Sequence, residues 1–259
     1  MNLVKTKAIV IRSIPYGESD LVVIFFSPAE GIIRGMAKGA RKSRKRFQGS
    51  LEPFATVMLG AAIKESGALA RVDAADLVNA RLGIREDLKK YGAGSVMLEL
   101  VSIFEVAGAH SGDAFSLLET ALDVLEMSSS PLSLLAAFFP GYLRLSGFAI
   151  PLSSCGRCGA DLAITGAMYA GGFSICCPGC APFCAACPPE AGLQVADLPA
   201  AISRGTVAFL RKAEAIGAEA IGRLKLGGKD EKDALDFLGR FAASAAGKRL
   251  KTLDIASEF

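Results

Sequence analysis

The chain has 259 residues, 51% of them hydrophobic and 21% charged, so it can bury a sizeable core in one or two domains and is not a disordered protein. One histidine, His110, and no tryptophan remove most Ser–His or Cys–His catalytic arrangements and any histidine-rich metal site. The formal net charge of +3 is unevenly distributed, because ten Lys or Arg and three Asp or Glu give residues 1–50 a net charge of +7.

The first eighty residues have the pattern of short β-strands. Residues 4–14 alternate apolar and basic side chains and lack the long apolar segment of a signal peptide. Turns at Pro15–Gly17 and at 27–31 then separate the apolar runs 21–26 and 32–36, and two more strands are expected over 54–63 and 69–78. Five short strands with turns between them predict a small antiparallel barrel.

Between the third and fourth predicted strands lies the basic run RGMAKGARKSRKR, residues 34–46, with seven Lys or Arg and no acid. Such a concentration of positive charge favours a polyanionic partner, and the alternative is a solvated loop without one. Phe47, which follows it, is expected either to stack on bases or to anchor the loop, whereas Phe25 and Phe26 are expected in the core. The candidate polyanion-binding residues are Arg34, Lys38, Arg41, Lys42, Arg44, Lys45 and Arg46.

From Leu82 the apolar period becomes helical. Apolar stripes predict helices around 97–104 and 115–125, the second with Glu119, Asp123 and Glu126 facing away from the core. A third, almost wholly apolar helix over 132–148 is expected to be buried in a soluble domain, because prolines, glycines and Arg144 make it a poor membrane span. Helices are also expected over about 197–217 and 230–248, and the last nine residues are expected to fray.

Four cysteines have the spacing of a metal site. Cys155-Gly-Arg-Cys158 and Cys177-Pro-Gly-Cys180 are two C-x2-C turns separated by eighteen residues, which is typical of a zinc ribbon. Four thiolates fill the coordination shell of Zn²⁺ and leave no position for water, so one such ion is structural. An iron–sulfur cluster is the alternative.

The other three cysteines leave questions open. Cys176 competes with Cys177 as a ligand, although only Cys177 gives the two-residue spacing to Cys180. Cys184 and Cys187 form a third pair that either replaces a ligand, contributes to a second metal or stays as reduced thiols. Seven cysteines without a secretion signal favour a reducing compartment over disulfides.

The order of these features resembles the RecO family of bacterial recombination mediators. Tyr16-Gly-Glu18-Ser-Asp20 resembles the family's Y-x-E-x-D signature, and Leu51-Glu-Pro53-Phe54 after the basic run resembles its L-x-P-F strand. Gly171-Gly172 ahead of Cys177 resembles the approach to its second zinc turn. The resemblance spans nearly the whole chain, and the extra cysteines depart from it.

The resemblance implies an α+β protein in which an N-terminal OB-fold β-barrel, residues 1–80, precedes an α-helical domain, residues 81–259, carrying a four-cysteine zinc-ribbon-like insert at about 153–190. It also implies no enzymatic turnover, binding of single- and double-stranded DNA, annealing of complementary strands, and location in the bacterial cytoplasm with the nucleoid. The implied partners are RecR, the C-terminal tail of single-strand-binding protein and, indirectly, RecA.

Two other functions are considered. An RNA-binding module that combines an OB-fold with a zinc ribbon would have the same charge pattern, and competition between DNA and RNA would separate the two. A zinc enzyme needs an open coordination position and a nearby base, and no H-x-E or H-E-x-x-H pattern is present. A groove for an acidic partner tail with apolar terminal residues is considered around Arg204, Arg211 and Lys212 beside Phe209 and Leu210, but an ordinary helix with a solvated charged edge is the favoured interpretation, so these residues are not predicted as a site.

Overall fold

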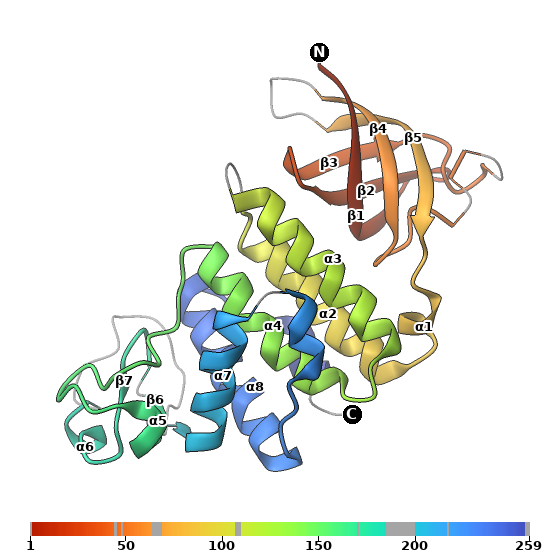
Figure 1. The fold of residues 1–259 in the computed structure, drawn as a ribbon. Coiled ribbons are helices and arrows are strands. Elements are labelled where there is room, and N and C mark those ends of the chain that lie inside the picture. Colours follow the sequence, from red (N-terminus) through yellow and green to blue (C-terminus); the bar gives the residue numbers. More distant parts are fainter. Residues whose placement is uncertain are drawn as a thin grey trace. The chain divides into compact units, whose positions relative to one another are not determined.

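The computed structural model forms two compact units, Met1–Met127 and Ser128–Phe259, which we describe separately (Figure 1). The division between domains expected at residue 80 stays a prediction. Among its described residues, the first unit includes helices as well as strands. The structure describes residues 2–43, 46–47, 49–63, 69–106, 110–169, 171–184, 200–216 and 218–256.

The first unit begins with a closed five-stranded barrel, as expected from the alternating pattern. Neighbouring strands follow the order β1-β2-β3-β5-β4, and β1 closes the barrel by pairing with both β2 and β4. The β3–β5 pair is parallel and the others are antiparallel, which is an OB-fold-like arrangement. The strands are β1 (Asn2–Tyr16), β2 (Asp20–Ser27), β3 (Gly31–Ala37), β4 (Thr56–Ile63) and β5 (Ala70–Asn79).

The barrel core explains why β2 is apolar at consecutive positions. Phe25 points into the barrel, where it joins a cluster that includes Val10 and Val57. Phe26 points the other way and meets Phe115 of α3 (Ser111–Met127), with ring centroids 6.0 Å apart. Both phenylalanines are fully buried, so their predicted place in the core is confirmed.

The helices of the first unit are α1 (Leu82–Arg85), α2 (Leu88–Ile103) and α3. Their predicted apolar stripes are buried, and Asp87 caps α2 by accepting hydrogen bonds from two backbone N–H groups of its first turn. Gly94 of α2 lies against the Phe54 ring, where an added Cβ would come within 2.9 Å of a ring carbon. A glycine is therefore needed at this helix position to let Phe54 pack.

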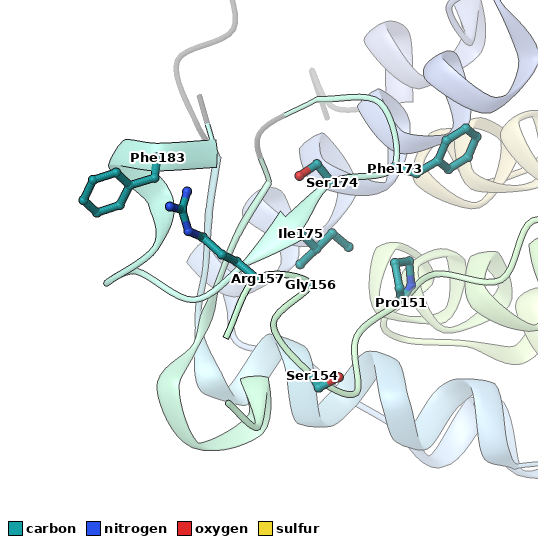
Figure 2. A pocket seen from close by; sticks show the side chains of 8 residues that line it. All are labelled: Pro151, Ser154, Gly156, Arg157, Phe173, Ser174, Ile175 and Phe183. Atoms are coloured by element: carbon teal, nitrogen blue, oxygen red, sulfur yellow. The ribbon is translucent and has the colours of Figure 1, made fainter. Parts of the chain in front are cut away.

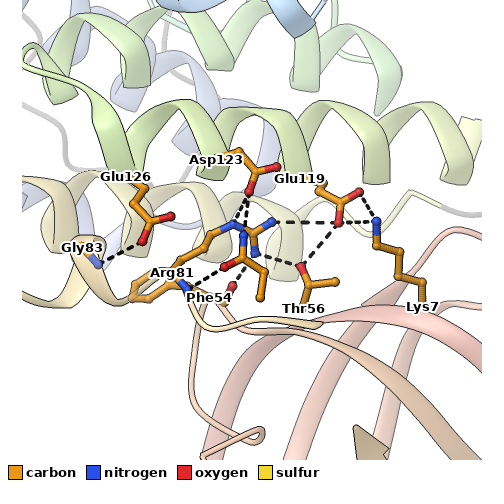
Figure 3. Close-up of polar contacts among 9 residues, drawn as sticks. Lys7, Phe54, Thr56, Arg81, Gly83, Glu119, Asp123 and Glu126 are labelled. Atoms are coloured by element: carbon orange, nitrogen blue, oxygen red, sulfur yellow. Dashed lines mark hydrogen bonds and ion pairs between the residues drawn. The ribbon is translucent and has the colours of Figure 1, made fainter. Parts of the chain in front are cut away.

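The acids of α3 lie off its apolar stripe, as expected, and Asp123 is exposed, but Glu119 and Glu126 are only partly exposed and all three make contacts that the sequence did not predict. Asp123 accepts a 2.7 Å hydrogen bond from Arg81 Nε, and Glu119 pairs with Lys7 of β1 at 2.7 Å (Figure 3). Glu126 accepts from the backbone N–H of Gly83. These acids connect α3 to the barrel and to the chain that leaves it.

The described part of the second unit contains five helical segments of six or more residues and a small sheet. The apolar α4 (Pro131–Leu145) is almost wholly buried, and the part of the chain that the structure describes has no helix long and apolar enough to cross a membrane. Residues 251–256, expected to fray, form α9 (Lys251–Ala256) instead, and Leu253 is buried against Gly239. The others are α7 (Arg204–Ala215), the 3-10 helix η2 (Ala218–Arg223) and α8 (Gly228–Ala246).

The cysteine-rich segment extends from the end of α4 and contains little regular structure. Strands β6 (Ala167–Tyr169) and β7 (Ile175–Cys176) form a hairpin, and β8 (Ala200–Ile202) pairs with the other edge of β6. Two one-turn helices, α5 (Leu162–Thr165) and α6 (Ala181–Cys184), complete the described part. Tyr169 fixes the hairpin to α8, because its hydroxyl lies 2.9 Å from Ser244 Oγ.

Candidate functional site

The four predicted cysteines lie together in the second unit. Cys155 and Cys158 belong to one tight turn, closed by a 3.0 Å hydrogen bond from Gly159 N–H to the Cys155 carbonyl. Cys177 and Cys180 belong to a second turn of the same kind, which follows β7 and is closed by Cys180 N–H. Gly156 N–H donates to the Ile175 carbonyl at 3.2 Å, so the backbone itself holds the two turns side by side.

The spacing of the sulfur atoms fits one tetrahedral ion. The four Sγ atoms all lie within 4.8 Å of one another, and those of Cys158 and Cys177 are 3.7 Å apart. A tetrahedron with metal–sulfur bonds of ~2.3 Å has sulfur–sulfur edges of ~3.8 Å. Cys155 and Cys177 are buried while Cys158 is exposed, so the site lies at the surface of the unit with one side in its interior.

The environment of the thiols favours binding of a cation. Burial raises the pKa of Cys155, but hydrogen bonds from the backbone N–H groups of Cys158, Cys177 and Arg157 outweigh this and lower the pKa to about 6. Hydrogen bonds of the Cys180 thiol to the Cys158 and Cys177 sulfurs raise the pKa of Cys180 to about 12. Four sulfurs this close can all ionise only when a positive ion lies among them.

The remaining cysteines differ in position. Cys176 is the last residue of β7, and its sulfur lies 3.8 Å from the Met168 carbonyl of the neighbouring strand β6. The structure therefore brings Cys177, and not Cys176, into the cluster. Cys184 ends α6, while its side chain and Cys187 fall outside the part that the structure describes.

The predicted polyanion-binding residues lie mainly in the connection from β3 to β4; we call residues 38–46 the basic loop. Lys38, Arg41, Lys42 and Arg46 are exposed, whereas Arg44 and Lys45 lie outside the described residues. Arg34 belongs to β3 rather than to the loop, and its guanidinium pairs with Glu105. The structure thus gathers four of the seven cations on the loop and places Arg34 beside an acid.

Asp20 holds the start of the basic loop. Its carboxylate accepts a 2.8 Å hydrogen bond from Gly39 N–H and a 3.0 Å hydrogen bond from the Ser19 hydroxyl. These bonds, in that order of effect, lower the pKa of Asp20 below its usual value. Arg41 N–H donates to the Ser19 carbonyl at 2.9 Å, which ties the loop to the β1–β2 turn at a second point. The sequence pattern identified Asp20 but not this role.

Phe47 holds the end of the basic loop. Its side chain is only 5% exposed and belongs to the barrel core, so of its two expected roles the structure shows the anchoring one. The Arg46 guanidinium lies 4.8 Å from the centre of this ring, on the outside. Tyr16, the last residue of β1, is a 60% exposed aromatic residue. It directly precedes Gly17 and Glu18, whose carbonyls accept hydrogen bonds from the Arg41 guanidinium.

On the helix considered for an acidic partner tail, α7, the two apolar side chains named are not exposed. Phe209 and Leu210 of α7 are buried in the unit. Arg211 pairs with Asp161 at 2.9 Å. The solvated-edge interpretation therefore describes this part of α7.

Comparison with known proteins gives consistent matches over nearly the full length. The family model described as Recombination protein O N terminal matches residues 1–81, and that described as Recombination protein O C terminal matches residues 85–254. A protein named DNA repair protein RecO from Syntrophus aciditrophicus is 31% identical over 98% of this chain and 95% of its own length. The protein of the same name from Anaeromyxobacter sp. strain K is 32% identical over 96% of this chain and 94% of its own length. That from Geobacter metallireducens is 34% identical over 81% of this chain and 85% of its own length.

Proposed function

The chain belongs to the RecO family of DNA repair proteins, and we propose that it acts as a recombination mediator that binds DNA through the basic loop. The observation that carries this proposal is the group of exposed cations Lys38, Arg41, Lys42 and Arg46 on one loop of an OB-fold-like barrel. OB-folds bind nucleic acid with one face of the barrel and its loops. Arg44 and Lys45 are proposed to add to the same group, and Arg34 to contribute least because of Glu105.

Binding of this kind is led by phosphates and does not depend on base sequence. The aromatic rings of Phe25 and Phe47 are buried in the barrel and cannot stack on bases, which leaves Tyr16 as the exposed ring beside the loop among the described residues. A protein that neutralises two backbones without burying their bases leaves the pairing edges free. This property supports the proposal that the protein anneals complementary strands, on single- and double-stranded DNA.

The remaining parts of the proposed role rest on family membership. They are cooperation with RecR, recognition of the C-terminal tail of single-strand-binding protein, and help in loading RecA onto coated DNA. In this role the protein has no catalytic turnover and lies with the nucleoid.

We further propose that the four-cysteine cluster holds one structural Zn²⁺. The tetrahedral spacing of the sulfurs supports one ion more than an iron–sulfur cluster, in which the thiolates surround several metal atoms. The ion would join two turns of a segment whose sheet has only two or three residues per strand. Its contribution would be to the stability of the second unit.

The test of DNA binding is the salt dependence of affinity. Four substitutions to Ala at Lys38, Arg41, Lys42 and Arg46 should weaken binding of a single-stranded oligonucleotide and reduce the slope of log K against log salt by about 3, since each phosphate contact contributes about 0.7. The matched control replaces four exposed lysines of the second unit by Ala and removes the same charge: Lys225, Lys229, Lys232 and Lys248.

The measurement is fluorescence anisotropy across a salt series, followed by annealing of complementary strands. If the loop variant keeps the slope of the unaltered chain, the placement on the loop is wrong. If both variants lose the same slope, net charge and not the loop carries the binding.

A further inference from the structure

The metal-binding segment carries a second surface feature, a cavity of about 400 Å³ that we call the ribbon pocket (Figure 2). It lies between the first cysteine turn, the β6–β7 hairpin and α6. Arg157, Phe173, Ile175 and Phe183 are among the residues that line it. All of these belong to the second unit, remote in sequence from the basic loop.

The lining combines exposed aromatic rings with one cation. Phe183 is 62% exposed and Phe173 is 54% exposed, and Figure 2 shows them at opposite ends of the pocket. The Arg157 guanidinium lies 4.7 Å from the centre of the Phe183 ring. Arg157 is the one ionised side chain among the lining residues that the structure describes, so the pocket attracts an anion that has an apolar, preferably planar, part.

Packing contacts hold two of the lining residues in place, so the pocket is already formed before a ligand binds. Phe173 stacks on Phe148 with centroids 6.5 Å apart and meets the edge of the buried Phe241 of α8 at 5.5 Å. Arg157 lies inside the first cysteine turn, whose backbone is fixed by the Gly156–Ile175 hydrogen bond. A preorganised site loses less entropy on binding.

We propose that the ribbon pocket holds an unpaired nucleobase of single-stranded DNA, stacked on Phe183, while Arg157 contacts the adjoining phosphate. The inference rests on the proposed function, which makes DNA the ligand of this chain, and adds a base-binding site on the second unit to a phosphate-binding site on the first. A base has the flat apolar faces and the attached negative charge that this lining fits, and stacking tolerates any sequence.

The absence of tryptophan from the chain makes a direct test possible. Phe183→Trp places a single fluorescent indole in the pocket, and Ile164→Trp places one at an exposed position, 67% for Ile164, that does not line it. We expect an oligo-dT strand to quench the first variant and not the second. An oligonucleotide of the same length with abasic sugars should quench neither.

A second measurement uses affinity. Phe183→Ala should weaken binding of oligo-dT by about 5- to 150-fold and leave binding of the abasic strand unchanged, because stacking of one base is lost. Unchanged metal content and melting temperature establish that the fold is intact. The loop variant with four Ala substitutions should instead lose affinity for both strands, so failure of the loop and failure of the pocket give different results.

Three outcomes would overturn the proposal. The first is equal affinity of Phe183→Ala and the unaltered chain for oligo-dT. The second is an equal loss of affinity of Phe183→Ala for the intact and the abasic strand, which would mean that the pocket does not bind bases. The third is quenching of Phe183→Trp by an acidic peptide with an aromatic end but not by oligo-dT, which would make the pocket a peptide site.

Discussion

The buried guanidinium of Arg81 gives the sharpest prediction about stability. Arg81 is 1% exposed, and its Nη1 donates to the Phe54 carbonyl at 2.6 Å and to Thr56 Oγ1 at 2.9 Å (Figure 3). Its Nε donates to Asp123 at 2.7 Å, and Glu119 lies 4.0 Å away. Thr56 begins β4, Phe54 lies just before it and both acids belong to α3, so one side chain connects two parts of the first unit.

Arg81→Met keeps the length of the side chain and removes its charge and its hydrogen bonds. Removing one partner of a buried pair costs about 3–5 kcal/mol. Asp123 is 50% exposed and recovers water when Arg81 is lost, so we expect the lower end, about 3 kcal/mol. That loss should accelerate amide hydrogen exchange in β4 by about 100-fold, since 1.4 kcal/mol corresponds to a factor of ten.

Hydrogen exchange read by mass spectrometry is the suitable assay, because the two units need not unfold together and a single unfolding curve would mix them. Arg71→Met is the matched control, since Arg71 pairs with Asp73 at the surface, 56% and 44% exposed, and should cost less than ~1 kcal/mol. If Arg81→Met accelerated exchange no more than Arg71→Met, the bridging role of Arg81 would be refuted.

Three more predictions concern the loop and the metal. Phe47→Ala should destabilise the first unit by about 3–5 kcal/mol and weaken DNA binding, although no charge is lost. Phe47→Leu should have a much smaller effect on both stability and affinity. Unfolding experiments measure the stability and fluorescence anisotropy measures the affinity. Asp20→Ala removes the acceptor of the Gly39 N–H and should speed trypsin cleavage within the basic loop. Hydrogen bonds lower the pKa of Asp20 in the folded protein below the unfolded value near 3.8. The hydrogen bond from Gly39 to the Asp20 carboxylate is therefore fully formed above pH 3.8 and is lost as the pH falls through the lower pKa of the folded protein. The amide resonance of Gly39 would report this loss. The purified chain should contain one zinc ion by mass spectrometry of its metals, and a chelator should destabilise the second unit by as much as ~10 kcal/mol. Cys177→Ser should lose the ion and its neighbour Cys176→Ser should keep it; the reverse result would exchange the two roles.

The barrel could be predicted from the sequence because its signals are local. Alternating residues gave β1, the turns at Gly17 and Gly31 set the strand ends, and both glycines have positive φ, 59° and 64°, where other residues are strained. The cysteine cluster could be predicted for the same reason, since two turns of fixed length determine where four sulfurs lie. The choice of Cys177 followed from spacing alone.

The contacts made by α3 could not be predicted, because they depend on a partner distant in sequence. An acidic stripe on an amphipathic helix normally faces water, and nothing local distinguishes Asp123 from a solvated acid. Its partner Arg81 has a left-handed backbone conformation with φ 44°, which no sequence motif predicts for an arginine. The short helix α9 was missed likewise, since Leu253 gains its burial from Gly239, which lies on another helix.

The way in which the basic loop is held bears on how it would act on DNA. A run of cations in a free loop would lose conformational entropy on binding and would bind more weakly than its charge suggests. Here Asp20 fixes the loop near Gly39 and Phe47 fixes the chain that follows it in the barrel core, so the loop is held at both ends. The Asp20 carboxylate bonds a backbone N–H and not a loop side chain, whereas the buried Phe47 ring also contacts the Arg46 guanidinium. Loosening either anchor should therefore lower affinity without changing the salt slope, whereas removing cations should change both.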